Sequence, residues 1–471
     1  MTDSQLAWKN LWRNRKRTVI TAASIFFAVF FALLMRSFQL GAYDRMFRNI
    51  IESYTGYLQI QHRDYFDEPI IDNSFELTPR VTEKIYSDPN VNTLVPRLES
   101  FALAADESRT QGVMVLGIDP EGEEKVTGLK SKLVKYKLTP ESIAALKRSS
   151  IPDRTKKLLD VFLNESYSSE GRLMLDLNIS QDDSADILPV LRRSASFRNE
   201  YLDINETDGA LIGNGLSDYL KAEIGDTIVL VGQGYHGTSA AGKFVVRGIV
   251  RLPAPDIDNI IVYLPITGAQ ELFAAPSMVT SAVLKLVNND DENVLQTGNN
   301  ISKQLEQPLA IRTWHEMNAL LINQLEADNR SGMIMIGILY LVIAFGVFGT
   351  VLMMIAERKR EFGMLVSIGM RKRKLAKIVS LEMVLIGILG LAAGVVASLP
   401  FVFYGNSHPI RFTGEMGRMY SDYGFEPVMP TLLPDTYYLS QIVVVLIILL
   451  VAILFCVRKI FRINVINALR A

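Results

Sequence analysis

Four long apolar runs constrain this chain more than any other feature of its sequence. A helix that crosses about 30 Å of hydrocarbon needs about 20 predominantly apolar residues. Runs of that length with few charges occupy residues 18–40, 331–356, 378–404 and 439–457. Core helices of a soluble protein would not explain why the charges around these runs are segregated. The runs therefore predict an α-helical membrane protein with four transmembrane helices, arranged as one helix, a large domain and then three helices.

Lysine and arginine residues gather on one side of the four runs. Basic clusters precede the first run, separate the second from the third and follow the fourth, whereas the segment after the third run has only Arg411 and Arg418. Because basic residues mark the cytoplasmic side, we expect both termini to be cytoplasmic. No small-residue cleavage site follows the first run, which favours an uncleaved signal anchor. The expected segments are a cytoplasmic amphipathic helix at 1–17, a cytoplasmic link at 357–377, an extracytoplasmic loop at 405–438 and a cytoplasmic tail at 458–471.

Residues 41–330 carry most of the acidic side chains. They hold 42 acidic and 29 basic residues, which leaves 8 of the 50 acidic and 20 of the 49 basic residues for the other 181 positions. The region is therefore net −13 in a chain whose net charge is only −1. It is long enough for one or two ordinary domains, and Cys456 is the only cysteine, so no internal disulfide can hold it. We expect a folded extracytoplasmic domain.

Periodicity within this region predicts a mixture of helices and strands. Alternation around Leu58 and Ile60, over 91–118 and after Gly225 is typical of strands. Helical spacing over 313–329 predicts a stalk helix that continues into the second apolar run. Residues 165–205 are polar and acidic and favour no element, and the sequence leaves open whether this insertion is ordered or mobile. The region is thus expected to be an α+β domain.

Two nucleotide-site patterns near Gly232 fail a structural test. Gly232, Gly234 and Gly237 match G-x-G-x-x-G, and Gly237 to Lys243 reads G-x-x-x-x-G-K. Both patterns need a helix to start next, so that its N–H groups can face phosphate. A strand-like FVVRGIV follows Lys243 instead, which predicts a glycine-rich hairpin. The four histidines show no metal-ligand spacing and no G-x-S-x-G elbow occurs, so no catalytic, metal or cofactor site is predicted in this chain.

The cytoplasmic link 357–377 is the strongest local signal. It mixes Phe362, Met364, Leu365, Val366 and Ile368 with many charges. A short helix with such an apolar face needs a partner, and the residues alone leave open whether that partner is another protein or the headgroups of anionic lipid.

Small residues recur at intervals of four in the third run. These residues are Gly390, Gly394 and Ser398, and Gly387 lies on the same side. Their small side chains would let another helix approach closely. The spacing leaves open whether that helix belongs to this chain or to a second subunit. Glu382 lies about one turn inside this run, and we favour a structural role for it.

The link and its neighbours resemble the signature of the FtsX-like, MacB-type permeases of ABC transporters, and most of all the Lol-type lipoprotein-releasing subunits. The resemblance extends to the start LAWKNLWRNRKRT, to the end INVINALRA, and to GIDP and IGNGLSDYLKAEIGD in the large domain. The matching residues of the link and third run are Arg360, Glu361, Phe362, Gly363, Gly369, Glu382, Gly387 and Gly394.

This resemblance implies a non-catalytic permease subunit of the bacterial inner membrane with a MacB-like periplasmic core domain. A separate cytoplasmic ABC ATPase dimer, which binds ATP and magnesium, would dock on the link and drive movements of the periplasmic domain. The implied coupling residues are Glu357, Arg358, Arg360, Glu361, Phe362, Gly363, Gly369 and Arg371. Further implied partners are a second permease subunit, the same or homologous, membrane lipid and a periplasmic lipoprotein carrier, with no nucleic acid.

The leading function is extraction of lipoproteins from the inner membrane. Two alternatives remain within the family: efflux or peptide export of the MacB kind, and regulation of a cell-wall hydrolase without transport, as in the FtsX kind. A membrane receptor that uses its outer domain as a ligand sensor is the alternative outside the family.

Overall fold

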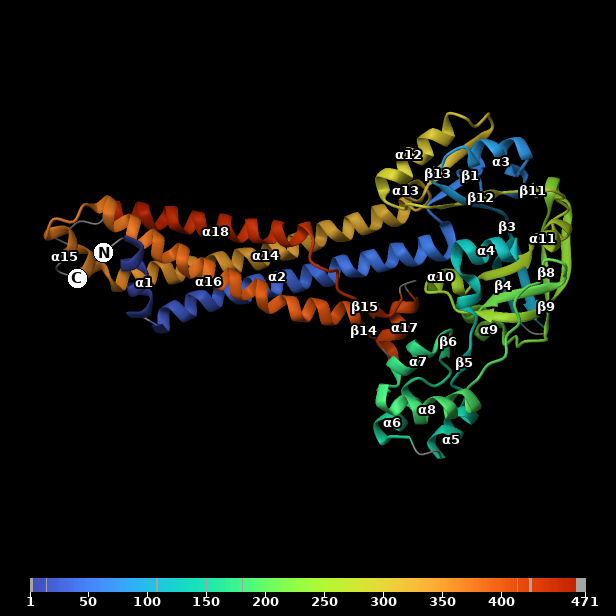
Figure 1. Cartoon of the computed structure of the whole chain (residues 1–471), viewed down its shortest axis with the longest axis horizontal. Coiled ribbons are helices and arrows are strands. Elements are labelled where there is room, and N and C mark those ends of the chain that lie inside the picture. The colour runs from blue at the N-terminus through green and yellow to red at the C-terminus, as the bar shows by residue number, and fades with distance from the viewer. Residues whose placement is uncertain are drawn as a thin grey trace. The chain divides into compact units, whose positions relative to one another are not determined.

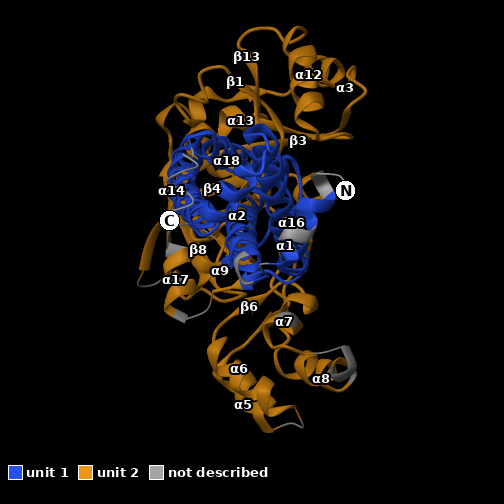
Figure 2. Ribbon diagram, turned by 90° about the vertical axis from the view of Figure 1, so that its left-hand side faces the viewer, with its two compact units in different colours: residues 1–45, 323–410, 428–471 blue, residues 46–322, 411–427 orange. Residues whose placement is uncertain are grey.

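The chain divides into two compact units, which are coloured separately in Figure 2. The computed structural model describes residues 3–13, 15–106, 109–148, 151–179, 181–412, 414–422 and 426–462. The segment INVINALRA, at 463–471, lies outside the described residues. We name the two units the helix unit, residues 1–45, 323–410 and 428–471, and the sheet unit, residues 46–322 and 411–427.

Four long helices form the helix unit and run side by side (Figure 1). They are α2 (Arg15–Ile50), α14 (Ala319–Glu357), α16 (Lys372–Ser407) and α18 (Thr436–Phe461). Among the described residues, these four are long and apolar enough to cross a membrane. Their 26 to 39 residues exceed the roughly 20 that a bilayer requires, so each helix is longer than a single crossing needs. Two short helices complete the unit: α1 (Asp3–Arg13) and α15 (Lys359–Ser367).

A closed ring of strands forms the centre of the sheet unit. Six strands close the ring, because β8 pairs with both β9 and β3. In ring order they are β3 (Val91–Asp106), β4 (Arg109–Ile118), β10 (Ile261–Pro265), β7 (Gly209–Gly213), β9 (Ser239–Val250) and β8 (Thr227–Gln233). Successive side chains of β3 point to opposite sides of the ring. Ala102 and Ala104 are buried in its interior, while Phe101 and Leu103 are exposed. Closure leaves these six strands without a free edge.

The first half of β3 also belongs to an open sheet. Its neighbours there are β12 (Ser281–Leu286), β1 (Leu58–His62) and β13 (Leu309–Thr313), all antiparallel. Leu58 and Ile60 are fully buried in β1, as the alternation predicts. The accompanying elements are η1 (Ile51–Thr55), β2 (Phe75–Glu76), α3 (Pro79–Tyr86), β11 (Met278–Val279), α12 (Asp291–Ser302) and α13 (Trp314–Met317). The predicted stalk helix is interrupted at Asn318, where α13 ends and before α14 begins.

Residues 136–195 fold into a helical lobe with its own apolar core, which includes Leu146, Leu159, Leu173 and Leu191. Its elements are β5 (Tyr136–Lys137), α5 (Pro140–Arg148), α6 (Asp153–Val161), β6 (Ser166–Tyr167), α7 (Glu170–Asp176) and α8 (Gln181–Ser194). Within the polar segment 165–205, for which the sequence favoured no element, the structure therefore places β6, α7 and α8. Widely spaced leucines supply the buried positions, and the many charges between them hid this pattern.

The predicted glycine-rich hairpin is confirmed by β8 and β9, which pair antiparallel through residues 227–245. Gly237 has φ +75 in the connection and Gly225 has φ +95 before β8, a backbone conformation that favours glycine. No helix begins after Lys243, because that residue lies inside β9. The other helices around the ring are α4 (Pro120–Thr127), α9 (Asn214–Leu220), α10 (Pro255–Asp258) and α11 (Ile266–Leu272).

Part of the expected loop at 405–438 belongs to the sheet unit. Residues 411–427 contain α17 (Gly414–Asp422), flanked by the short strands β14 (Ile410–Arg411) and β15 (Val428–Met429), which pair with each other. Residues between two membrane helices thus contribute to the sheet unit. No local pattern predicts this arrangement, because the contacts join residues more than 230 positions apart.

Candidate functional site

Two breaks in the helix create α15 between α14 and α16. The first lies at Arg358, whose φ of −97 and ψ of 8 leave the helical region. The second lies at Gly369, which has φ +106. There the N–H of Met370 donates to the oxygen of Leu365 and the N–H of Gly369 to that of Val366, the pattern of a Schellman cap that glycine favours. Gly369 is therefore required by the turn.

The inner face of α15 is held by a buried ion pair. Arg358 Nη1 lies 2.8 Å from Glu382 Oε2 on α16, and the two side chains are 8% and 0% exposed. Arg358 Nε also donates to Glu361 Oε2 at 3.1 Å. Phe362 is fully buried and its ring lies 5.4 Å from the Arg358 guanidinium carbon. Buried charges in a membrane protein are stable only when paired, so this pair fixes α15 to α16.

The outer face of α15 exposes apolar side chains. Met364, Leu365 and Ile368 are 46%, 36% and 84% exposed. Four residues of the predicted coupling set are also exposed: Glu357, Arg360, Gly369 and Arg371. We name these seven residues the coupling face. The structure thus divides the predicted coupling residues by their exposure. Three of them are buried, namely Arg358, Phe362 and Gly363, and Glu361 is partly exposed.

The link also contacts the N-terminal helix, which sequence reasoning missed. Arg13 Nη2 lies 3.0 Å from Glu361 Oε2, and the two side chains are about half exposed. Glu361 therefore accepts from Arg13 and from Arg358 at the same oxygen. The abundance of basic residues at the N-terminus signalled a role there, but nothing in the sequence selects Arg13 as the partner of Glu361.

The three glycines of the third run pack against helices of the same chain. A Cβ on Gly387 would lie 2.6 Å from Leu449 Cδ1 on α18. On Gly390 it would lie 2.7 Å from the Ala22 oxygen of α2, and on Gly394 it would lie 2.9 Å from Val29 Cβ. The small residues therefore allow α16 to approach both α2 and α18 closely.

Gly390→Ala is expected to lower the melting temperature of the detergent-solubilised chain, because the new methyl group would overlap the backbone of α2. The matched control is Gly337→Ala in α14, where an added Cβ meets nothing within 4 Å. That control should leave the melting temperature unchanged or raise it, since alanine favours a helix over glycine by about 1 kcal/mol. Equal melting of the two variants would contradict the close approach.

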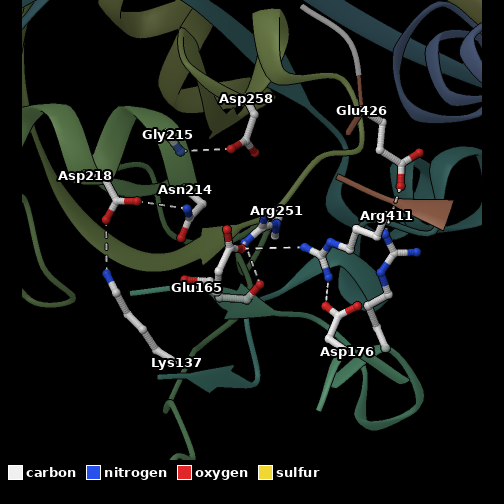
Figure 3. Close-up of polar contacts among 12 residues, drawn as sticks. Lys137, Glu165, Asp176, Asn214, Gly215, Asp218, Arg251, Asp258, Arg411 and Glu426 are labelled. Atoms are coloured by element: carbon white, nitrogen blue, oxygen red, sulfur yellow. Dashed lines mark hydrogen bonds and ion pairs between the residues drawn. The ribbon is translucent and has the colours of Figure 1, made fainter. Parts of the chain in front are cut away.

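A second polar cluster lies in the sheet unit, between the helical lobe and residues 411–427 (Figure 3). Glu165 lies 2.8 Å from Arg251 at the end of β9 and 3.8 Å from Arg411. Arg411 also pairs with Asp176 of α7. One carboxylate thus bridges an arginine of the ring and an arginine from the segment between two membrane helices. These residues carried no sequence signal.

Asp258 lies near this cluster and is itself buried (Figure 3). Its carboxylate accepts from the backbone N–H of Leu252 at 2.7 Å and of Gly215 at 2.8 Å. Burial raises the pKa of Asp258 to about 6, although both N–H groups favour the charged form. From the end of α10, the carboxylate thus connects α9 with the segment that follows β9, which is a structural role.

Among the described residues, no three His, Cys, Asp or Glu side chains gather closely enough to hold a metal ion. The only cysteine, Cys456, is buried in α18.

The C-terminal part of the chain matches a known protein family. Residues 333–465 match the family described as FtsX-like permease C-terminal. This region is an FtsX-like permease domain. The matched region includes α15, the Arg358–Glu382 pair and the three glycines. The predicted resemblance to FtsX-like permeases is confirmed.

The chain is also similar to lipoprotein-releasing system transmembrane proteins LolC. It is 24% identical over 194 residues to LolC of Neisseria meningitidis serogroup B and 22% identical over 194 residues to LolC of Xylella fastidiosa. Each match covers 40% of this chain and 46% of the relative, so the chain spans about half the length of the curated relatives it matches. The match to transmembrane proteins agrees with the four long apolar helices of this chain.

Two solved structures of domains outside the membrane are similar in part. The periplasmic region of MacB from Actinobacillus actinomycetemcomitans is 10% identical with a TM-score of 0.32, over 59% of this chain and 98% of that one. The extracellular domain of the noncanonic ABC-type transporter YknZ from Gram-positive bacteria is 10% identical with a TM-score of 0.29, over 55% and 99%.

Proposed function

We propose that this FtsX-like permease is the non-catalytic membrane subunit of an ABC transporter, and that a separate cytoplasmic ATPase binds its coupling face. The observation that carries the proposal is the construction of α15. Its inner face is fixed to α16 by the buried Arg358–Glu382 pair, and its outer face presents exposed apolar side chains.

The coupling face has the composition of a protein interface. Its apolar centre consists of Met364, Leu365 and Ile368. Its charged rim includes Arg360 and Arg371. Protein interfaces combine these two features, and the rim charges determine specificity more than affinity. A loose segment that only touched lipid would not need a buried ion pair beneath it. We therefore favour a protein partner over lipid for this face.

The same construction would transmit force. A load on α15 would reach α16 through Arg358 and Glu382, which are 2.8 Å apart, and would reach α14 through the single break at Arg358. With 39 residues, α14 is about 58 Å long at 1.5 Å per residue. This helix follows the sheet unit in sequence and ends at the link, and we place the sheet unit outside the cytoplasm with both termini inside.

The proposed substrate is a lipoprotein, extracted from the outer leaflet of the inner membrane toward a periplasmic carrier. The similarity to LolC over 194 residues supports this choice. We further propose that the working complex holds two permease subunits and an ATPase dimer that binds ATP and magnesium.

Ile368→Asp is expected to weaken binding of the ATPase about 30-fold, because it places a charge at the centre of the interface, where single residues contribute about 2 kcal/mol or more. The measurement titrates the purified chain in nanodiscs with an ABC ATPase of the same genome. Leu320→Asp is the matched control, because Leu320 and Ile368 are both 84% exposed but Leu320 lies at the start of α14. Binding that is unchanged by Ile368→Asp, or weakened equally by both variants, would contradict the coupling face.

A further inference from the structure

The N-terminal helix α1 has two faces with different surroundings. Ala7 and Leu11 are buried where α1 packs along α16. Trp8 and Trp12 are 46% and 55% exposed, and their ring centroids lie 6.1 Å apart. On this predicted amphipathic helix, the small and aliphatic residues Ala7 and Leu11 therefore face the protein, and the indoles face outward. Two large aromatic side chains remain uncovered on one exposed side of the helix.

The N-terminal sequence that contains these indoles is basic. From residue 4 to residue 43 the sequence has no acidic residue, whereas residues 9–17 include Lys9, Arg13, Arg15, Lys16 and Arg17. The guanidinium of Arg15 lies 5.9 Å from the centroid of the Trp12 ring. Tryptophan beside lysine or arginine is typical of helices that lie in the headgroup region of a membrane.

The position of α1 relative to the first membrane helix is fixed. Helix α2 begins at Arg15, two residues after α1 ends. The hydroxyl of Thr18, in the first turn of α2, donates to the oxygen of Leu11 in α1 at 3.0 Å. This hydrogen bond holds the corner between the two helices. The exposed indoles therefore belong to the helix that directly precedes the first long apolar helix.

The basic end of α1 also contacts the link. Arg13 pairs with Glu361 at 3.0 Å, and Glu361 accepts in turn from Arg358, the partner of Glu382. A continuous series of charged contacts thus joins α1, α15 and α16. A change in the position of α1 would move Arg13 and so alter the positive charge next to Glu361.

We propose that α1 binds anionic phospholipid headgroups through Trp8, Trp12 and Arg15, and that Arg13 transmits this contact to α15. The occupant is an anionic lipid surface, because the exposed side combines indoles with positive charge beside a membrane helix. The position of the coupling face then depends on the lipid composition of the membrane. This inference does not depend on the identity of any ATPase.

Tryptophan quenching tests the lipid contact on the full chain. The variant Trp314→Phe retains Trp8 and Trp12 as the only tryptophans of the three. It is placed in nanodiscs of phosphatidylcholine, with or without phosphatidylglycerol, that contain lipid brominated near the headgroup. Phosphatidylglycerol should increase the quenching, and salt should reverse the increase. Arg15→Gln should lower the equilibrium constant of the docked state about fivefold, as the loss of one basic residue near a charged surface does.

The control for charge is Arg80→Gln, because Arg80 is an exposed arginine of the sheet unit with a side chain 74% exposed. It should leave the quenching unchanged. Equal quenching in both kinds of nanodisc, or quenching unaffected by Arg15→Gln, would overturn the proposal, because the indoles would then insert into any bilayer. Shielding of the indoles only after addition of a soluble protein would also overturn it, since the exposed side of α1 would be a protein-binding surface.

A spin label on the coupling face tests the transmission. Ile368→Cys places the label at a position that is 84% exposed, in a Cys456→Ala background. Phosphatidylglycerol should change the mobility of the label, and Arg13→Gln should abolish this change while quenching of the indoles persists. A label that does not respond to lipid would refute the role of Arg13. Both experiments use the chain without ATPase, so their failure is distinct from failure of the proposed function.

Discussion

Arg97→Met is expected to lower the free energy of unfolding of the sheet unit by about 3–5 kcal/mol, the usual effect of removing one partner of a buried ion pair. Arg97 Nη2 lies 2.6 Å from Glu123 Oε1, and both side chains are at most 2% exposed. Arg97 Nε donates to the second oxygen of Glu123 at 2.9 Å, and Nη1 donates to the backbone oxygen of Tyr54.

The variant would leave a buried carboxylate with Thr127 Oγ1 as its described hydrogen-bond donor, at 3.0 Å. It would also remove the donor to Tyr54. Because Arg97 connects β3 with η1 and α4, its loss affects the place where the chain from α2 enters the sheet unit. Methionine fills a similar volume, so the expected change reflects charge and hydrogen bonding more than packing.

Hydrogen exchange of the β3 and β4 amides in the full detergent-solubilised chain would measure this change. The matched control is Arg80→Met, which removes an arginine whose ion pair with Glu306, at 2.8 Å, is largely exposed. An exposed pair contributes about 0–1 kcal/mol, so exchange should barely change. Equal effects of the two variants would show that burial does not strengthen the Arg97–Glu123 pair.

Arg358→Leu is the second substitution with a large expected effect, about 3–5 kcal/mol on the helix unit. It would leave Glu382, which is fully buried in α16, without its guanidinium partner. Loss of the pair would also detach α15 from α16, since Arg358 is the residue that contacts both Glu361 and Glu382. We expect a lower melting temperature and loss of ATPase binding at the coupling face.

The double variant Arg358→Leu with Glu382→Leu separates these two consequences. Replacing both charges by apolar side chains should restore most of the stability, because no buried charge remains. ATPase binding should not recover, because the polar connection between α15 and α16 would still be absent. Thermal melting and titration of the same nanodisc samples provide both measurements. Recovery of binding together with stability would show that the pair only stabilises the helix unit.

Local sequence patterns predicted the four long helices and several strands of this protein. A membrane helix must satisfy its backbone internally and expose apolar side chains to lipid, so its length and composition are visible in the sequence. The four long helices follow from such runs. In the same way, alternation and turn glycines predicted the β8–β9 hairpin, whose paired strands are close in sequence. The apolar residues of the link were visible too, although the sequence did not show which of them face outward.

The tertiary structure alone decided which distant elements meet. The ring closes because residues 102–105 of β3 pair with residues 229–232 of β8, and no local periodicity encodes a pairing over that separation. Arg358 meets Glu382 across the turn at Gly369, and Arg411 meets Asp176 across more than 230 residues. Local patterns reflect the energies of residues that are neighbours in sequence. The two ion pairs, by contrast, form only in the packed structure, because burial removes their charges from water and makes an unpaired charge unfavourable.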